Sequence, residues 1–138
     1  MMGGHCLKTY SSTQEIIALS SGEAEFYGIV KAGACGLGVV SLLRDLGVNM
    51  KLSVYTDSSA GKSIGSRRGV GKVRHLDTRE LWIQERVARG DLTLKKVSGA
   101  ENVADILTKH VTRSVLDKHM HKIGVVRRAG RNTLCPSI

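Results

Sequence analysis

Small and apolar residues recur at helical spacing over a long stretch in the first third of the chain. The stripe consists of Ile29, Ala32, Gly36, Val40 and Leu43. Residues at this spacing share one face of a helix. Ser20 followed by Glu23 fits a capping box, in which each side chain satisfies a backbone N–H at the start of a helix, and Gly47 suits a left-handed cap at the other end. We therefore predict a helix from Ser21 to about Leu46.

Three glycines interrupt this helical pattern, namely Gly33, Gly36 and Gly38. Each lowers the intrinsic helix propensity by roughly 1 kcal/mol relative to alanine. We interpret them as positions where the helix packs closely against a sheet, in preference to a ligand-binding loop.

Shorter apolar runs predict that strands and helices follow one another along the rest of the chain. Runs at Lys51–Thr56 and Leu92–Val97 are typical of strands, and His5–Thr9 with Glu15–Leu19 is expected to form an antiparallel hairpin. Further helices are predicted at Ser58–Gly65, His75–Arg89, Val103–His110 and Thr112–Ile123. This order of elements indicates the α/β class.

Length and composition favour one domain in a reducing compartment. The 138 residues suit a single core, which we expect over 1–123, followed by a disordered basic tail over 124–138. Three cysteines without paired spacing indicate an intracellular chain, cytoplasmic or nuclear, without a zinc site. No apolar run approaches the length needed to span a bilayer, so we expect no membrane partner.

The charge balance points to an anionic polymer as partner. Lys and Arg number 21 against 12 Asp and Glu, which gives a formal net charge of +9, and this excess favours nucleic acid. Basic residues gather before and within the helix predicted at His75–Arg89, namely Arg67, Arg68, Lys72, Arg74 and Arg79. Such a density suits phosphate contacts, although a run of charges also occurs as a solvated face.

Two carboxylates open the long helix, and they have different interpretations. Glu23 has a structural task in the capping box. Glu25 stands at the head of the apolar stripe, where a half-buried carboxylate costs free energy unless a hydrogen bond or a cation compensates it. The alternative is that Glu25 points outward past the helix end. The pattern by itself leaves both open.

Two aspartates stand at the ends of other predicted elements. Asp57 directly follows the strand Lys51–Thr56, a position where α/β folds carry site residues. Alternatively, Asp57 caps the next helix. Asp105 lies in the first turn of the helix predicted at Val103–His110, where the helix dipole favours a carboxylate.

Four segments of the chain resemble the RNase H domain that closes the polyprotein of copia-type retrotransposons. They are ALSSGEAEFYG at Ala18–Gly28, VYTDSSAGKSI at Val54–Ile64, RHLDTRELWIQERV at Arg74–Val87 and ENVADILTKH at Glu101–His110. With the strands between them they cover nearly all of Gly3–His110. The joint order of the four segments is more specific than any one of them.

The resemblance implies an RNase H-like mixed sheet flanked by helices and a site for two Mg²⁺ or Mn²⁺ ions. The family holds these ions with four acidic residues, the last three of which correspond to Glu25, Asp57 and Asp105. One ion would orient and deprotonate the attacking water, and the other would stabilise the leaving 3′ oxygen. The expected reaction is cleavage of the RNA strand of an RNA–DNA hybrid, recognised by groove shape and 2′-OH contacts. The upstream reverse transcriptase region of the same polyprotein is an implied partner.

One departure from the family changes the expected activity. The first acidic residue of this chain is Glu15, whereas the family carries its first Asp on a strand before the Gly3-Gly4 turn. We therefore expect a fold that lacks this strand, and weak or no cleavage by these residues alone. The alternative is a non-catalytic, basic nucleic-acid-binding remnant. An unrelated structural or DNA-binding module would require the three matched carboxylates to be coincidental caps.

Overall fold

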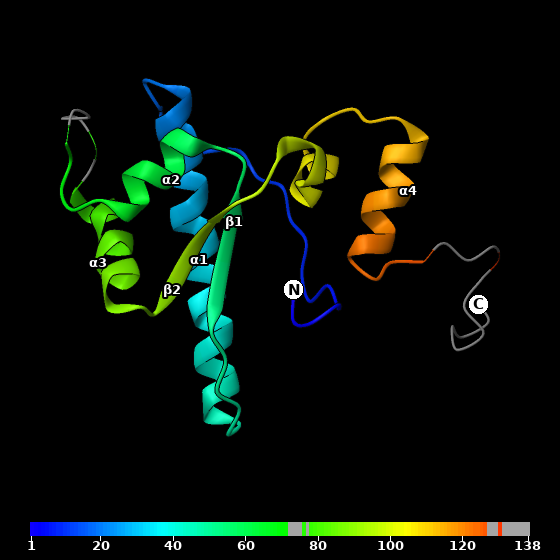
Figure 1. Cartoon of the computed structure of the whole chain (residues 1–138), viewed down its shortest axis with the longest axis horizontal. Helices are drawn as coiled ribbons and strands as arrows, with labels where there is room; N and C mark the ends of the chain where they lie inside the picture. The colour runs from blue at the N-terminus through cyan, green and yellow to red at the C-terminus, as the bar shows by residue number, and fades with distance from the viewer. Residues whose placement is uncertain (72–75, 77, 127–129, 131–138) are drawn as a thin grey trace. The chain divides into compact units, whose positions relative to one another are not determined.

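The computed structural model describes residues 1–71, 76, 78–126 and 130 (Figure 1). The chain forms two compact units. The larger unit comprises Thr13–Asn102, and the smaller unit comprises Met1–Ser12 together with Val103–Ile138. The expected domain over 1–123 and the disordered tail over 124–138 stay predictions, and most of that tail lies outside the described residues.

Helix α1, Ser21–Asp45, is the longest element of the larger unit. It begins after Ser20, whose Oγ accepts a hydrogen bond from the Glu23 backbone N–H at 3.2 Å. It ends before Gly47, which has a φ of 81°, a left-handed conformation that glycine adopts without strain. The predicted helix and both of its predicted ends are therefore confirmed.

Strands β1 (Leu52–Thr56) and β2 (Leu92–Lys96) pair in parallel, with Thr56 opposite Lys96. The alternation of side chains gives the sheet one buried and one exposed face. Val54, Thr56, Leu92 and Leu94 are buried, whereas Tyr55, Thr93 and Lys95 are exposed. Within the described residues the sheet consists of these two strands. The α/β class is confirmed, and a wider mixed sheet stays a prediction.

The connection from β1 to β2 runs through α2 (Ser59–Ser66), the 3₁₀ helix Thr78–Leu81 and α3 (Trp82–Arg89) (Figure 1). Helix α1 packs against α2 and β1, while α3 packs against α2 and β2. Together these elements bury one apolar cluster, formed by Phe26, Tyr27, Ile29, Val30, Val54, Ile64, Leu76, Ile83, Leu92 and Leu94. Burial of such side chains is the main favourable term in folding.

The three glycines of α1 lie in different surroundings. A Cβ at Gly33 would collide with the Ile83 side chain, and a Cβ at Gly36 would lie 2.6 Å from Leu52 Cδ1. The interpretation of close packing against a sheet is confirmed for Gly36, because Leu52 belongs to β1, whereas Gly33 packs most closely against Ile83 of an α-helix. It is wrong for Gly38, where a Cβ would meet no described atom within 4 Å.

The smaller unit contains the 3₁₀ helix Val103–Leu107 and helix α4, Arg113–Lys122. Helix α4 was predicted, but Val103–Leu107 is 3₁₀ rather than α-helical, a geometry common in such short pieces. At the end of α4, a Cβ on Gly124 would lie 2.8 Å from the Gly4 carbonyl oxygen. The N-terminal turn, in which Met2 pairs with His5, therefore lies against the end of this helix.

The predicted hairpin of His5–Thr9 and Glu15–Leu19 is wrong, because neither segment is a strand. Ile17 and Leu19 are exposed. An isolated two-stranded hairpin is marginal in water unless one face is buried, and these residues bury no such face.

Helix α1 is long and apolar enough to cross a membrane by length and composition alone, with a mean hydropathy of 1.7 in its best window. The sequence-based expectation that no run approaches this length is therefore wrong. A core helix of a globular unit passes the same test, and Phe26, Ile29 and Val30 of α1 belong to the apolar cluster.

Candidate functional site

The first turn of α1 carries a buried carboxylate, and it belongs to Glu23. This side chain is 1% exposed. Its Oε2 accepts a hydrogen bond from the Leu19 backbone N–H at 2.9 Å, and its Oε1 accepts one from the Tyr27 hydroxyl at 2.9 Å. The structural task predicted for Glu23 is confirmed, although its side chain reaches Leu19 instead of the cap residue.

Glu25 lies on the opposite side of the same turn and is exposed. The idea of a half-buried carboxylate at this position is wrong, because the buried face of the first turns is centred on Glu23, Phe26 and Tyr27. Helical spacing from Glu23 generates this face. The base of the Glu25 side chain nevertheless packs closely, since a Cβ on Gly61 of α2 would lie 3.1 Å from Glu25 Cβ.

Asp57 stands between the end of β1 and the start of α2. The alternative in which Asp57 caps α2 is wrong, because Ser58 is the cap and its Oγ accepts from the Gly61 N–H at 3.0 Å. The Asp57 carboxylate is half-buried and approaches the turn after β2, with its Oδ2 3.8 Å from where a Cβ on Gly99 would lie. A Cβ at position 99 would therefore make an ordinary van der Waals contact with this carboxylate.

Lys96, the last residue of β2, also reaches this turn. Its Nζ donates to the backbone oxygen of Asp57 at 2.6 Å and to Ser59 Oγ at 2.6 Å. Sequence reasoning missed Lys96. Its position at the carboxyl end of a predicted strand was the available signal, whereas its contact with Asp57 depends on the register of the two strands.

Asp105 belongs to the smaller unit, in the 3₁₀ helix Val103–Leu107. Its side chain is 19% exposed and forms an ion pair with Lys109, with 2.9 Å between Oδ2 and Nζ. Its backbone oxygen accepts the Lys109 N–H at 2.8 Å. Asp105 thus lies in the first turn of this 3₁₀ helix, and the predicted place in a first turn is confirmed.

Of the three predicted carboxylates, Glu25 and Asp57 are thus brought to one end of the larger unit. Both border the first turn of α2, Glu25 across from Gly61 and Asp57 immediately before the Ser58 cap. Asp105 lies in the other unit. Among the described residues, no three His, Cys, Asp or Glu side chains are grouped in a way that could hold a metal ion.

The predicted basic cluster contains two arginines with different surroundings. The Arg67 guanidinium donates to the Val70 backbone oxygen and lies against Gly71, so it stabilises its own loop. Arg68 is exposed and is the better candidate for a phosphate contact. Lys72 and Arg74 lie outside the described residues, as does the side chain of Arg79.

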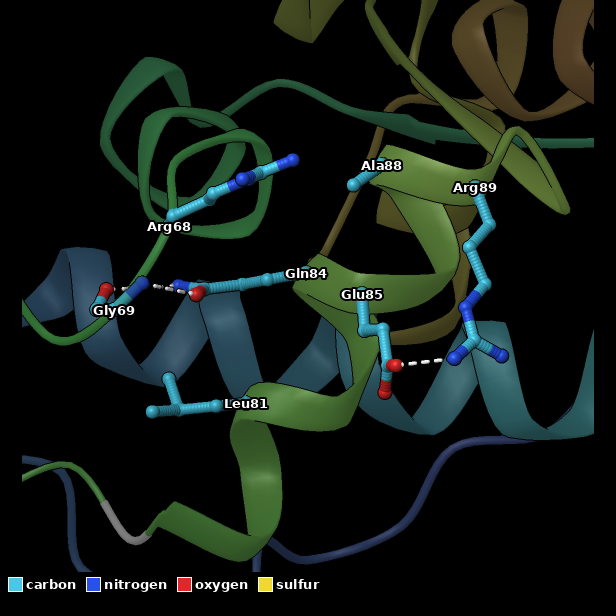
Figure 2. A pocket seen from close by; sticks show the side chains of 7 residues that line it. All are labelled: Arg68, Gly69, Leu81, Gln84, Glu85, Ala88 and Arg89. Atoms are coloured by element: carbon cyan, nitrogen blue, oxygen red, sulfur yellow. Dashed lines mark hydrogen bonds and ion pairs between the residues drawn. The ribbon is translucent and has the colours of Figure 1, made fainter.

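Arg68 borders an open pocket of about 460 Å³ between the loop after α2 and helix α3. Figure 2 shows Arg68 on one side of this pocket and the ion pair of Glu85 with Arg89 on the other. The remaining lining residues are Gly69, Leu81, Gln84 and Ala88. The pocket offers two cations and one carboxylate that is already paired.

Gln84 connects this pocket to the core, and sequence reasoning missed it as well. It is buried; its Oε1 accepts from Gly69 N at 2.8 Å, and its Nε2 donates to the backbone oxygens of Ile64 and Gly69 at 2.8 and 3.1 Å. The two bonds to Gly69 fasten the loop after α2 to α3 (Figure 2), and the bond to Ile64 fastens α2 itself. The only sequence signal for this role was the position of Gln84 directly after Ile83, on the apolar side of the predicted helix.

Comparison with known proteins gives relatives of one kind. The chain is 31% identical over 124 residues to the retrovirus-related Pol polyprotein from transposon TNT 1-94 of Nicotiana tabacum, which covers 88% of the chain and 9% of that relative. It is 26% identical over 129 residues to the corresponding polyproteins from transposons RE1 and RE2 of Arabidopsis thaliana, covering 91% of the chain and 9% of each.

The chain therefore spans about a tenth of the length of these curated relatives. No family model matches the chain, and no solved structure matches it. Its homologues are thus retrovirus-related Pol polyproteins of plant transposons.

Proposed function

We propose that this chain is an RNase H-like domain of a copia-type Pol polyprotein, acting as a metal-dependent endonuclease on the RNA strand of RNA–DNA hybrids. The observation that carries the proposal is the position of Glu25 and Asp57 on two sides of the first turn of α2. These residues come from segments far apart in a chain whose relatives are Pol polyproteins.

The donor chemistry of these residues fits a hard divalent cation. Carboxylate oxygens are the ligands that Mg²⁺ prefers, and neither Glu25 nor Asp57 serves as the cap of its helix. Glu25, Asp57 and Asp105 would hold Mg²⁺ or Mn²⁺. The bound ions would activate water and stabilise the leaving oxygen of a phosphodiester.

The charge of the chain supports a nucleic-acid substrate. A net charge of +9 attracts a polyanion and releases its counterions. Arg68 and Arg89 flank the pocket beside α3. Among the described residues, these two arginines are our candidates for contacts with nucleic-acid phosphates. The upstream reverse transcriptase region of the polyprotein is the partner that would share the hybrid.

A second candidate function is a basic module that binds nucleic acid without cutting it. The net charge of +9 supports binding as well as it supports cleavage. The lack of a three-residue metal group among the described residues favours binding without cleavage. The two candidates differ in whether Asp57 matters, because substitution of a metal ligand removes cleavage and leaves charge-driven binding in place.

The test is cleavage of a labelled RNA–DNA hybrid with Mg²⁺ or Mn²⁺ by the 138-residue chain and by the same chain joined to the preceding segment of the tobacco relative. Asp57→Asn is the test variant. Asp45→Asn is the matched control, because it removes the same charge at the far end of α1, about 30 Å from Glu25 at 1.5 Å per residue.

Cleavage of the RNA strand that is lost in Asp57→Asn and retained in Asp45→Asn would support the endonuclease. Equal cleavage by both variants would indicate a contaminating nuclease and reject the assignment. Binding without cleavage by either form of the chain would favour the non-catalytic module.

A further inference from the structure

A second pocket of the larger unit, of about 430 Å³, lies between α1 and the end of α3. Three segments line it: the carboxyl-terminal half of α1, the loop that leads into β1, and the end of α3 with the turn that follows. We call it the Lys51 pocket, after the lining residue that directly precedes β1. Pockets that bind small molecules have volumes of about 300–1,000 Å³, so its size suits a small organic ligand or one unit of a polymer.

Among the described residues, three cations and one carboxylate line the Lys51 pocket. Arg86 and Asp91 form an ion pair, with 2.9 Å between Nη1 and Oδ2. The other two cations, Arg44 and Lys51, are exposed, and within the described ranges their side chains form no hydrogen bond or ion pair. Two positive charges are therefore available to an anion. A divalent cation does not fit this lining, because its carboxylate is already neutralised.

The same pocket also has neutral polar and apolar surface. Ser41 and Asn49 supply a hydroxyl and an amide, which can both donate and accept hydrogen bonds. Leu37, Val40 and Met50 supply apolar side chains. Met50 is 38% exposed, so part of this apolar surface faces water. The lining thus suits a ligand that combines an anionic group with an apolar, hydrogen-bonding part.

The Lys51 pocket is separate from the proposed catalytic residues. Arg44 lies about 28 Å along α1 from Glu25, at 1.5 Å per residue. Asp57 follows the carboxyl end of β1, whereas Lys51 precedes the amino end of the same strand. Binding of a ligand in this pocket therefore requires neither Glu25 nor Asp57.

We propose that the Lys51 pocket binds a nucleotide. Its phosphate contacts Arg44 and Lys51, because guanidinium and ammonium groups form charge-assisted hydrogen bonds with phosphate oxygens. Its base packs on the apolar side chains and forms hydrogen bonds with Asn49. A free nucleotide and a nucleotide unit of single-stranded RNA present the same chemistry, and titrations with both distinguish the two sources.

The first measurement is an NMR titration of the 138-residue chain with adenosine monophosphate, followed at the amides of residues 41–51. Adenosine, which lacks the phosphate, is the matched ligand. We expect adenosine monophosphate to shift these amides and to bind about tenfold more tightly than adenosine, because only the nucleotide forms the charge-assisted hydrogen bonds. The amides of Ser58 and Gly61, beside Asp57, are expected to stay unshifted.

The second measurement tests the two cations by substitution. We expect Lys51→Met and Arg44→Met each to raise the Kd for adenosine monophosphate about tenfold, and Lys95→Met to leave it within about twofold, because solvent and salt screen distant exposed charges. Lys95 is the matched control, since it is exposed and lies opposite Tyr55, toward the other end of the sheet from Lys51. All three substituted side chains are exposed, so the variants are expected to keep the parent's NMR spectrum elsewhere.

A third titration, with a short RNA oligoadenylate, identifies the source of the nucleotide. Tighter binding of the oligoadenylate than of adenosine monophosphate at the same amides would assign the pocket to single-stranded RNA, whereas equal or weaker binding would assign it to the free nucleotide. Absence of shifts with both ligands would overturn the proposal. Equal binding of adenosine and adenosine monophosphate, or equal losses in Lys51→Met and Lys95→Met, would overturn the phosphate contacts.

Discussion

Glu23 accepts a hydrogen bond from the Tyr27 hydroxyl at 2.9 Å, one helical turn along α1, and both side chains are buried. Two residues further along the chain from Glu23, Glu25 is exposed beside α2. Of the two glutamates in the segment SSGEAEF, Glu23 therefore has a structural role and Glu25 occupies the candidate functional position.

The first prediction concerns this division. Glu23→Ala leaves the Tyr27 hydroxyl and the Leu19 N–H without their acceptor, so we expect the free energy of unfolding to fall by about 1–3 kcal/mol. Glu25→Ala is expected to change it by less than about 0.5 kcal/mol. Urea denaturation of both variants checks the prediction, and an equal loss in the two would contradict it.

The second prediction separates Asp57 from its neighbour Ser58. Ser58→Ala removes the N-cap of α2 and is expected to cost about 1 kcal/mol of stability. Asp57→Asn is expected to leave stability nearly unchanged and to weaken binding of Mn²⁺. Denaturation curves and calorimetric titrations of the two variants give the comparison, and a larger stability loss in Asp57→Asn would show that this residue is structural.

The third prediction uses two glycines of the same helix. Gly38→Ala meets no described atom within 4 Å, so the gain in helix propensity is expected to raise stability by up to about 1 kcal/mol. At Gly33 a new Cβ collides with buried Ile83, and overpacking typically costs about 1–3 kcal/mol. Thermal unfolding is therefore expected to shift upward for the first variant and downward for the second.

The fourth prediction concerns the loop after α2. Gln84→Ala removes two hydrogen bonds that fasten this loop to α3 and one that fastens α2 to α3, and we expect a loss of about 1–3 kcal/mol because the Gly69 and Ile64 backbone groups lose their partners. Glu85→Ala, on the exposed side of α3, is the control and is expected to stay within about 0.5 kcal/mol. Faster amide exchange at Gly69 in Gln84→Ala alone would locate the effect in the loop.

The fifth prediction distinguishes two adjacent arginines. Arg68→Ala is expected to weaken nucleic-acid binding and to reduce the slope of log K against log salt by about 1, as the loss of one phosphate contact does. Arg67 is held by the Val70 oxygen, so Arg67→Ala is expected to lower stability and to leave that slope unchanged. Binding titrations at several salt concentrations measure the slope, and a reduced slope for Arg67→Ala would contradict the assignment.

Local sequence patterns predicted helices α1, α2 and α4, both ends of α1 and strands β1 and β2. Ser20 and Gly47 set the ends of α1 because side-chain hydrogen bonding and the freedom of glycine act within a few residues. The alternation of Leu92 and Leu94 with exposed neighbours similarly marked β2. These signals need no knowledge of distant parts of the chain.

The tertiary structure decided which face of α1 is buried and which side chains meet. The predicted stripe is packed at Ile29 and Gly36, but Glu25 at its head is exposed. Glu23, which the stripe does not include, is buried beside Phe26, and packing against α2 and β1 decided this difference. Lys96 and Asp57 are 39 residues apart, and their contact depends on the register of two parallel strands. Such contacts arise from packing between distant segments, so the order of residues in any one segment could not have revealed them.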